Sequence, residues 1–232
     1  MKKIIFMSRI DPYKKIIIMI KQTSLLLVFL AFIFHVSAQK TRHYNLVQLL
    51  TENKLDTTKT EMHILNDNNY KQAISLKGTA WLKDVSFTKG TIEVDLRGKN
   101  VFLQSFLGIA FHSVNDSIYD VVYFRPFNFK HEDTLRRKWS VQYMSMPGYD
   151  YDKLRKEHPL VYENAVTPVP GPDDWFHATI IISDDSAAVY VNHSSTASLK
   201  VHLLNNRGDG KIGLWSYTPG VSGDFANLII KQ

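Results

Sequence analysis

The chain has 232 residues, no cysteine, and 28 basic against 22 acidic residues. The lack of cysteine excludes disulfides, thiolate metal sites, cysteine nucleophiles and iron–sulfur clusters, and also the lipoprotein anchor that is attached to a cysteine. Stability must then come from a hydrophobic core, and the chain is long enough to form one domain with such a core.

A targeting segment is predicted at the N-terminus. Lys21 and earlier lysines precede an apolar run, Leu25–Val36, that is short for a membrane span, and small residues end at Ala38. We expect residues 1–38 to be a signal peptide cleaved near Ala38, which makes the protein secreted or periplasmic. The alternative is an uncleaved anchor over residues 16–36, in which Lys21 would lie unfavourably in the membrane. Translation starts at Met1 or at Met19.

The net charge of +6 belongs mostly to this leader, which holds six of the basic residues and one acid, Asp11. The remaining residues carry 22 bases and 21 acids. A nucleic-acid partner requires a persistent basic surface, so the nearly neutral remainder argues against one. The basic runs Arg136–Lys138 and Lys153–Lys156 are interpreted as solvated loop charges.

Four short strands are predicted in a row from the alternation of apolar and polar residues. They cover Thr91–Arg97, Phe106–His112, Tyr119–Arg125 and Trp139–Tyr143. Period-two alternation indicates that one face packs into a core and the other does not. The polar face would hold Glu93, Asp95, Arg97, His112, Tyr123, Arg125 and Gln142. This set suits a polar ligand such as a sugar.

The rest of the chain completes an all-β pattern. Residues 39–61 are expected to be an irregular segment, and residues 62–232 a single domain with strands at roughly ten-residue spacing. Residues 146–172 form a long insertion with four prolines, Pro159, Pro168, Pro170 and Pro172, which excludes a central strand there. The insertion is either a lid or cleft wall, or a surface loop without a role.

The order of these segments resembles the concanavalin A-like lectin/glucanase superfamily, and within it the 3-keto-disaccharide hydrolase-like (LamG-like) domains of secreted bacterial proteins. The resemblance is carried by Gly90–Arg97, Phe106–His112, Val122–Asn128, Val141–Tyr143, Trp175–Ala178, Val189–Val191, Gly210–Trp215 and Asp224–Leu228. It implies a jelly-roll sandwich of two antiparallel sheets with a concave groove for saccharide. The resemblance supports the fold more strongly than it supports any particular activity.

Glu93 and Asp95 share a strand face, since residues two apart point the same way. Laminarinase-type glycosidases carry Glu-x-Asp with a further glutamate on such a strand, but here Arg97 stands in its place. A retaining mechanism needs two suitably spaced carboxyl groups, so the standard glucanase mechanism is not expected. The alternative is that Glu93 and Arg97 flank Asp95 in a surface ion-pair ladder.

His112 could serve as a general base and Arg125 could stabilise a developing oxyanion, which suits proton abstraction next to the ketone of a 3-keto glycoside. The candidate catalytic residues are therefore Glu93, His112 and Arg125, and the candidate substrate-binding residues are Asp95, Arg97, Tyr123, Asn128 and Gln142. No metal or cofactor is expected for catalysis, although a structural calcium ion near Asp67–Asn69 is one further expectation.

Three functions remain open at this stage. The first is an exported protein that binds glycans or disaccharides without catalysis. The second is a glycoside hydrolase or lyase of the 3-keto-disaccharide hydrolase type. The third is a structural or adhesion domain. The expected partner is a saccharide, with no nucleic acid and no membrane span once the leader is removed, whereas the oligomeric state is not predicted.

Overall fold

The computed structural model describes residues 11–13, 16, 40–57 and 60–232. The apolar run of the predicted signal peptide and its cleavage site near Ala38 lie outside these residues. Within the described part of the chain, no helix is both long and apolar enough to cross a membrane. Lys40–Gln232 forms a compact unit of its own, and all strands named below belong to it.

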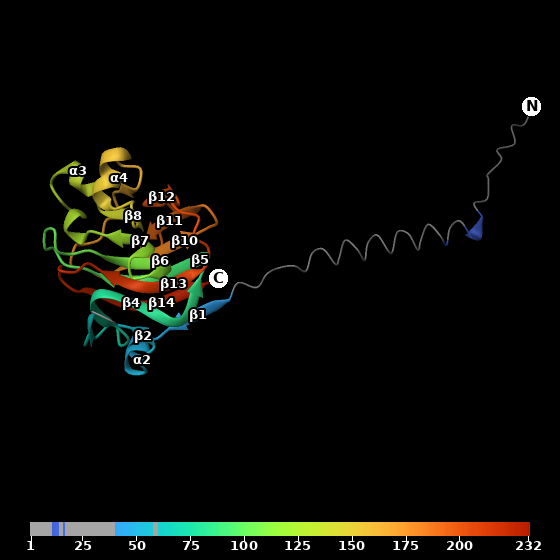
Figure 1. Cartoon of the computed structure of the whole chain (residues 1–232), viewed down its shortest axis with the longest axis horizontal. Helices are drawn as coiled ribbons and strands as arrows, with labels where there is room; N and C mark the ends of the chain where they lie inside the picture. The colour runs from blue at the N-terminus through green and yellow to red at the C-terminus, as the bar shows by residue number, and fades with distance from the viewer. Residues whose placement is uncertain (1–10, 14–15, 17–39, 58–59) are drawn as a thin grey trace, which may run out of the picture. The chain divides into compact units, whose positions relative to one another are not determined.

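Two antiparallel sheets make up this unit (Figure 1). Sheet A contains β1 (Thr41–Tyr44), β3 (Glu61–Ile64), β5 (Gly90–Arg97), β10 (Phe176–Ile182), β11 (Ser186–Val191), β12 (Leu199–His202) and β14 (Gly223–Lys231). Sheet B contains β2 (Leu55–Asp56), β6 (Leu107–Asn115), β7 (Ile118–Phe124), β8 (Val141–Met146), β9 (Glu163–Asn164) and β13 (Gly210–Ser216). The predicted all-β jelly-roll sandwich is confirmed.

One long strand, β4 (Ile74–Phe87), belongs to both sheets. Its first residues pair with β14 of sheet A, and its later residues pair with β13 of sheet B. The strand order therefore runs continuously from β12 through β4 to β9. The sequence predicted only Ala73–Leu76 of this strand, because Gly78 interrupts the apolar pattern there.

The core lies between the sheets and is filled by alternate residues of each strand. In β5 the side chains of Ile92, Val94 and Leu96 are completely buried. Phe111, Val122 and many further apolar residues of sheet B pack in the same cluster. The predicted alternation is thus realised, with one face of each sheet turned inward and the other outward.

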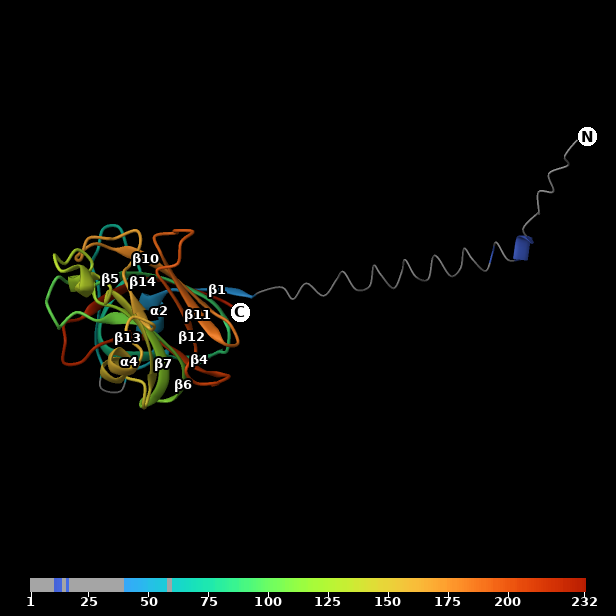
Figure 2. The ribbon, with the colours of Figure 1, turned by 90° about the horizontal axis from the view of Figure 1, so that it is seen from above.

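Helices and loops cover parts of the sandwich. The segment 39–61, expected to be irregular, contains β1, α2 (Leu46–Thr51) and β2, because Leu46 and Leu55 are buried in the core. The 3-10 helix η1 (Pro126–Asn128) and α3 (Thr134–Arg137) connect β7 to β8. The long insertion carries α4 (Tyr151–Glu157), which lies next to β8 (Figure 1), and Figure 2 shows this helix from above.

Candidate functional site

The acidic strand β5 does not face the same region as the other predicted site residues. Since Ile92, Val94 and Leu96 fill the core, Glu93, Asp95 and Arg97 lie on the outer face of sheet A. Tyr123 and Gln142 lie on β7 and β8 of sheet B. The expectation that all of them share one polar face is therefore wrong, because alternation fixes the face of a strand but not the sheet that the strand joins.

Each charged residue of β5 has a partner from a neighbouring segment. Lys231 Nζ lies 2.6 Å from Glu93 Oε1, and His177 Nδ1 lies 2.7 Å from Asp95 Oδ1. Arg97 donates to Asp224 Oδ2 at 2.9 Å and to Asp67 Oδ2 at 3.0 Å. These contacts join β5 to β10, to β14 and to the loop before β4, so they differ from the alternative interpretation, in which Glu93 and Arg97 flank Asp95.

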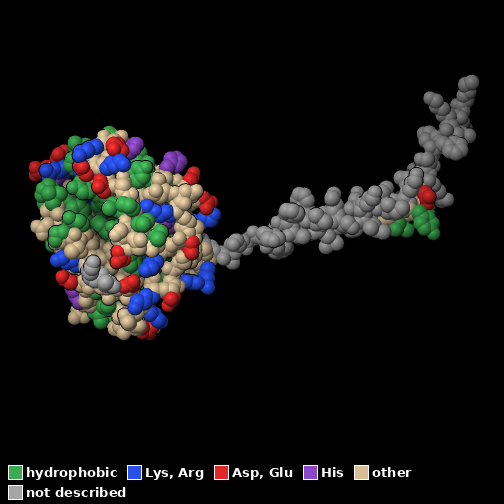
Figure 3. Space-filling view, viewed as in Figure 1, with side chains coloured by type: hydrophobic (Ala, Val, Ile, Leu, Met, Phe, Trp, Pro, Cys, Tyr) green, Lys and Arg blue, Asp and Glu red, His purple; other side chains and the backbone are tan. Residues whose placement is uncertain are grey.

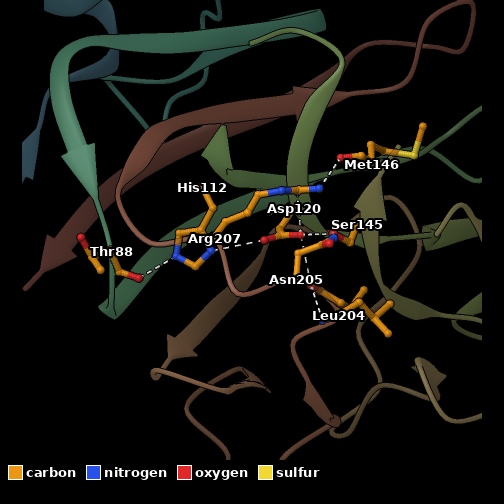
Figure 4. Close-up of polar contacts among 9 residues, drawn as sticks. Thr88, His112, Asp120, Ser145, Met146, Leu204, Asn205 and Arg207 are labelled. Atoms are coloured by element: carbon orange, nitrogen blue, oxygen red, sulfur yellow. Dashed lines mark hydrogen bonds and ion pairs between the residues drawn. The ribbon is translucent and has the colours of Figure 1, made fainter. Parts of the chain in front are cut away.

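His112 lies in a buried polar network (Figure 4). Its side chain is 2 % exposed, its Nε2 lies 2.6 Å from the carbonyl oxygen of Thr88, and its Nδ1 lies 3.2 Å from Asp120 Oδ2. Both ring nitrogens are thus occupied by acceptors within the fold. This position suits a structural link between the β4–β5 turn and β7 better than a base that meets a substrate.

Asp120 is the centre of this network and is completely buried. Its Oδ1 accepts hydrogen bonds from Tyr143 Oη at 3.1 Å, from Arg207 Nη1 at 3.1 Å and from Ser145 Oγ. Burial and then the Asp120 charge raise the pKa of Tyr143 above its ordinary value. The network ties the loop before β13 to sheet B (Figure 4).

Three predicted residues do meet on the outer face of sheet B. Tyr123 and Gln142 are directly opposite in the β7–β8 pairing, and Tyr123 Oη donates to Gln142 Oε1 at 2.7 Å. Arg125 Nη2 donates to both of these oxygens, and its Nη1 donates to the Trp139 carbonyl at 2.9 Å. Burial raises the pKa of Tyr123 to about 12, so its hydroxyl stays protonated at neutral pH.

Arg125 also lines a small pocket next to this triad, which we call the arginine pocket. Its volume is about 90 Å³, and it is lined by Phe102, Leu103, Arg125, Phe127, Asn128, Arg136, Trp139 and Arg155. Two of the predicted site residues, Arg125 and Asn128, are among them. Residues from the β5–β6 loop, from the β7–β8 connection and from α4 thus converge at one end of sheet B.

Three arginines line the pocket, and one buried carboxylate, that of Glu163, forms ion pairs with two of them. Glu163 is 2 % exposed and accepts two hydrogen bonds from Arg155, at 2.9 and 2.6 Å, while Arg125 Nη1 lies 3.7 Å away. Burial lowers the pKa of Arg125. Burial alone would also lower the pKa of Arg155, but the hydrogen bonds and charge of Glu163 outweigh it and raise that pKa.

Two amide side chains beside the arginines are buried, and each has one atom without a hydrogen-bond partner among the described residues. Asn128 Nδ2 donates to the Trp139 carbonyl at 3.2 Å, but its Oδ1 accepts no hydrogen bond within the described residues. Gln142 Oε1 is used twice, whereas its Nε2 has no partner there. Buried polar atoms are nearly always hydrogen-bonded, so unpaired ones call for an explanation, of which a ligand is one.

The resemblance implies a groove along the outer face of sheet B. In the structure, packed side chains fill the middle of this face. Trp81 and Trp215 are 3 % and 8 % exposed, and Leu154 of α4 packs in the same cluster. Helix α4 of the insertion thus packs against this face. Figure 3 shows hydrophobic side chains gathered near β7 and β8, beside mixed charges over α3 and α4.

A wider hollow lies at a different part of this face. It has a volume of about 380 Å³ and is lined by Asp56, Gly78, Thr79, Trp81, Asp116, Ser117 and Thr218. Asp116 Oδ1 accepts a hydrogen bond from Trp81 Nε1 at 2.8 Å. None of the residues predicted from the sequence lines this hollow.

The sequence did not predict Arg136 and Arg155 as site residues. Both belong to basic runs that were interpreted as solvated loop charges, and both line the arginine pocket. Only the structure shows their aromatic neighbours: Arg155 lies over the Trp139 ring at 4.0 Å and Arg136 over the Phe102 ring at 4.6 Å. Such stacking holds a guanidinium group in place.

No group of three or more His, Cys, Asp or Glu side chains is placed to hold a metal ion within the described part of the chain. Near the turn where calcium was expected, the carboxylate of Asp67 accepts from the Asn69 N–H, from Trp175 and from Arg97. The Asn69 bond contributes most to lowering the pKa of Asp67.

Solved structures share this architecture. The carbohydrate-binding module CBM66 from Bacillus subtilis superposes with a TM-score of 0.52 at 13 % identity, covering 76 % of this chain and 95 % of its own. This likeness shows the jelly-roll fold that the resemblance implied. At this identity the likeness shows the jelly-roll fold and nothing about the ligand.

Two further jelly rolls extend the comparison. A protein of unknown function with a galectin-like fold from Bacillus subtilis has a TM-score of 0.50 at 13 % identity, covering 84 % of this chain and 98 % of that one. A β-1,3-1,4-glucanase (lichenase) derived from a mouse hindgut metagenome has a TM-score of 0.50 at 10 % identity, covering 82 % and 98 %. No family model matches the sequence, and no curated protein matches it.

Proposed function

We propose that this protein is an exported jelly roll that binds saccharide without catalysis, and that the arginine pocket is its binding site. The observation that carries the proposal is the arrangement of Arg125 and Asn128 at the pocket, with Gln142 beside them. Sugars are recognised by directional hydrogen bonds from a few placed polar groups together with contacts to aromatic rings. The pocket offers both, since Phe102 is 49 % exposed and Asn128 Oδ1 accepts no hydrogen bond from any residue that the structure describes.

The comparisons support the same proposal. One structure with this fold is named as a carbohydrate-binding module and another as a lichenase, so saccharide recognition occurs on this architecture. The fold alone does not assign a function, and the site must do so. Export is inferred from the predicted leader and remains a prediction.

The hydrolase or lyase hypothesis depends on Glu93, His112 and Arg125 acting together. Glu93 is paired with Lys231 on the outer face of sheet A, and His112 is enclosed by Thr88 and Asp120. A general base must come within hydrogen-bonding reach of the substrate, which this arrangement does not favour. A purely structural domain would gain nothing from leaving one atom in each of two buried amide groups, among the described residues, without a hydrogen-bond partner beside three arginines.

The proposal can be tested with the purified protein and a panel of neutral, acidic and 3-keto saccharides, following binding by calorimetry and products by chromatography. We expect binding without turnover. Phe102→Ala should weaken binding about fivefold through loss of an exposed ring contact. Ile181→Ala is the matched control, because Ile181 is 40 % exposed on β10 of sheet A, away from the pocket.

Glu93→Gln separates the two functional hypotheses. The binding proposal expects unchanged affinity, whereas a glycosidase that uses Glu93 would lose its turnover. Turnover that disappears in this variant would overturn the proposal, and so would a panel in which no saccharide binds.

A further inference from the structure

The arginine pocket has an excess of positive charge that a neutral sugar would not need. Three guanidinium groups line it, from Arg125, Arg136 and Arg155. We propose that it binds the carboxylate of an acidic sugar, a uronic acid residue of a glycan. This inference rests on the proposed saccharide-binding function and names the chemical class of the ligand.

The acidic groups around the pocket do not balance its arginines. Glu163 is shared between Arg125 and Arg155, so one negative charge faces two positive charges. The ion pair of Arg136 is with Asp133, at 4.0 Å and with side chains that are 35 % and 51 % exposed, and such partly exposed pairs are weak. An anionic ligand would supply the missing charge at a place where burial makes charge complementarity strong.

The arginines also present free donors. Arg155 uses Nε and Nη2 on Glu163, and Arg136 Nη1 lies 3.3 Å from His131 Nε2. Within the residues that the structure describes, Arg155 Nη1 and Arg136 Nη2 donate no hydrogen bond. Both guanidinium groups are oriented by stacking on Trp139 and Phe102. Planar, oriented guanidinium groups match the geometry of a carboxylate.

Asn128 provides a hydrogen-bond acceptor, which a simple anion would not use. Its unpaired Oδ1 is an acceptor, so it would repel a carboxylate but can accept a hydrogen bond from a sugar hydroxyl. An acidic sugar carries a carboxylate and hydroxyls on one ring, which fits donors and an acceptor in one pocket. The volume of about 90 Å³ suits the acidic end of one residue.

A neighbouring hollow gives room for a second sugar residue. It has a volume of about 240 Å³ and shares Phe127 with the arginine pocket. Its other lining residues are Asn100, Lys130, His131, Glu132 and Pro172. We therefore expect an oligosaccharide to bind more tightly than a single uronic acid.

The test is calorimetric titration of the purified protein with uronic acid trisaccharides, with the methyl ester of each, and with a sulfated trisaccharide. The esters keep every hydroxyl and remove only the charge. We expect the acids to bind about tenfold more tightly than the esters, because hydrogen bonds to charged groups are the stronger ones. Preference for the sulfated sugar over every uronate would overturn the carboxylate assignment.

Arg136→Gln should reduce the affinity for the acid about tenfold and leave that for the ester nearly unchanged. Arg137→Gln is the matched control, since it removes the same charge from the same helix at a residue outside the pocket lining. Equal losses in both variants would indicate general charge attraction and overturn the inference. Equal binding of acids and esters would overturn it while the saccharide-binding function stands, whereas absence of any saccharide binding would overturn both.

Discussion

Glu163 and Arg125 place a carboxylate 3.7 Å from a guanidinium group, with both side chains almost completely buried. Glu163 belongs to β9, a two-residue strand in the proline-rich insertion, and Arg125 directly follows β7. The same carboxylate binds Arg155 of α4. Glu163 therefore fixes the insertion to sheet B and positions two of the three arginines of the pocket.

Glu163→Gln should destabilise the protein by about 3 kcal/mol, because it leaves two partly or fully buried guanidinium groups without their counter-charge. Urea unfolding followed by tryptophan fluorescence measures this change. Glu157→Gln is the control, since Glu157 is an exposed residue of α4. A loss below about 1 kcal/mol, similar to the control, would show that the shared carboxylate does not hold the insertion.

Asp120→Asn should be at least as destabilising, by about 3 kcal/mol. The amide keeps the size of the side chain but removes the charge that faces His112 and Arg207, and it replaces one of the two acceptor oxygens by a donor. Urea unfolding is again the measurement, with the exposed Asp185→Asn as control.

The folded Asp120→Asn variant should bind saccharide as the parent protein does, because the network lies away from the arginine pocket lining. Loss of binding with unchanged stability would mean that His112 and its partners belong to the functional site.

The positions of most strands could be predicted, because alternation leaves a direct trace in the sequence. Ile92, Val94 and Leu96 mark the inward face of β5, and all three are completely buried. The sheet to which β5 belongs is set by its pairing with β10 and β14, which are far away in the chain. Local patterns carry no information about that pairing, so Glu93 and Arg125 were placed together although they lie on different sheets.

The alternation pattern also assigned His112 to the wrong face of its strand, and the reason is local. The pairing of β6 with β7 shifts register between Phe111 and Asn115, and His112 has a positive φ of 50°. A bulge of this kind changes the face to which the next side chain points. The bulge packs against Gly210, where a Cβ would lie 2.5 Å from the His112 carbonyl carbon. A histidine gives no sign of such a bulge in the sequence.

Arg136 and Arg155 were not predictable as site residues because short helices and loops bring them to the pocket. Helix α3 has four residues, too few for a periodic pattern to show which face is covered. In contrast, Tyr123, Arg125 and Gln142 were predicted together because they continue the alternation of adjacent strands β7 and β8.

The pH dependence of stability provides a test of the Tyr123–Arg125 arrangement. Burial raises the pKa of Tyr123 from 10.0 to about 12, so the folded protein holds this proton at pH values where the unfolded chain loses it. Stability from this group is complete below about pH 10 and is lost as the pH rises toward 12. The expected loss is roughly 2–3 kcal/mol.

Tyr123→Phe isolates this contribution, because it removes the titrating hydroxyl and keeps the ring. Urea unfolding at about pH 9 and about pH 11 should show a smaller decrease for the variant than for the parent protein. The variant should be less stable at the lower pH, since Arg125 and Gln142 lose a hydrogen-bond partner. An identical decrease in both proteins would mean that Tyr123 ionises in the folded state as readily as in the unfolded chain, which is incompatible with a buried hydroxyl that donates to Gln142 and accepts from Arg125.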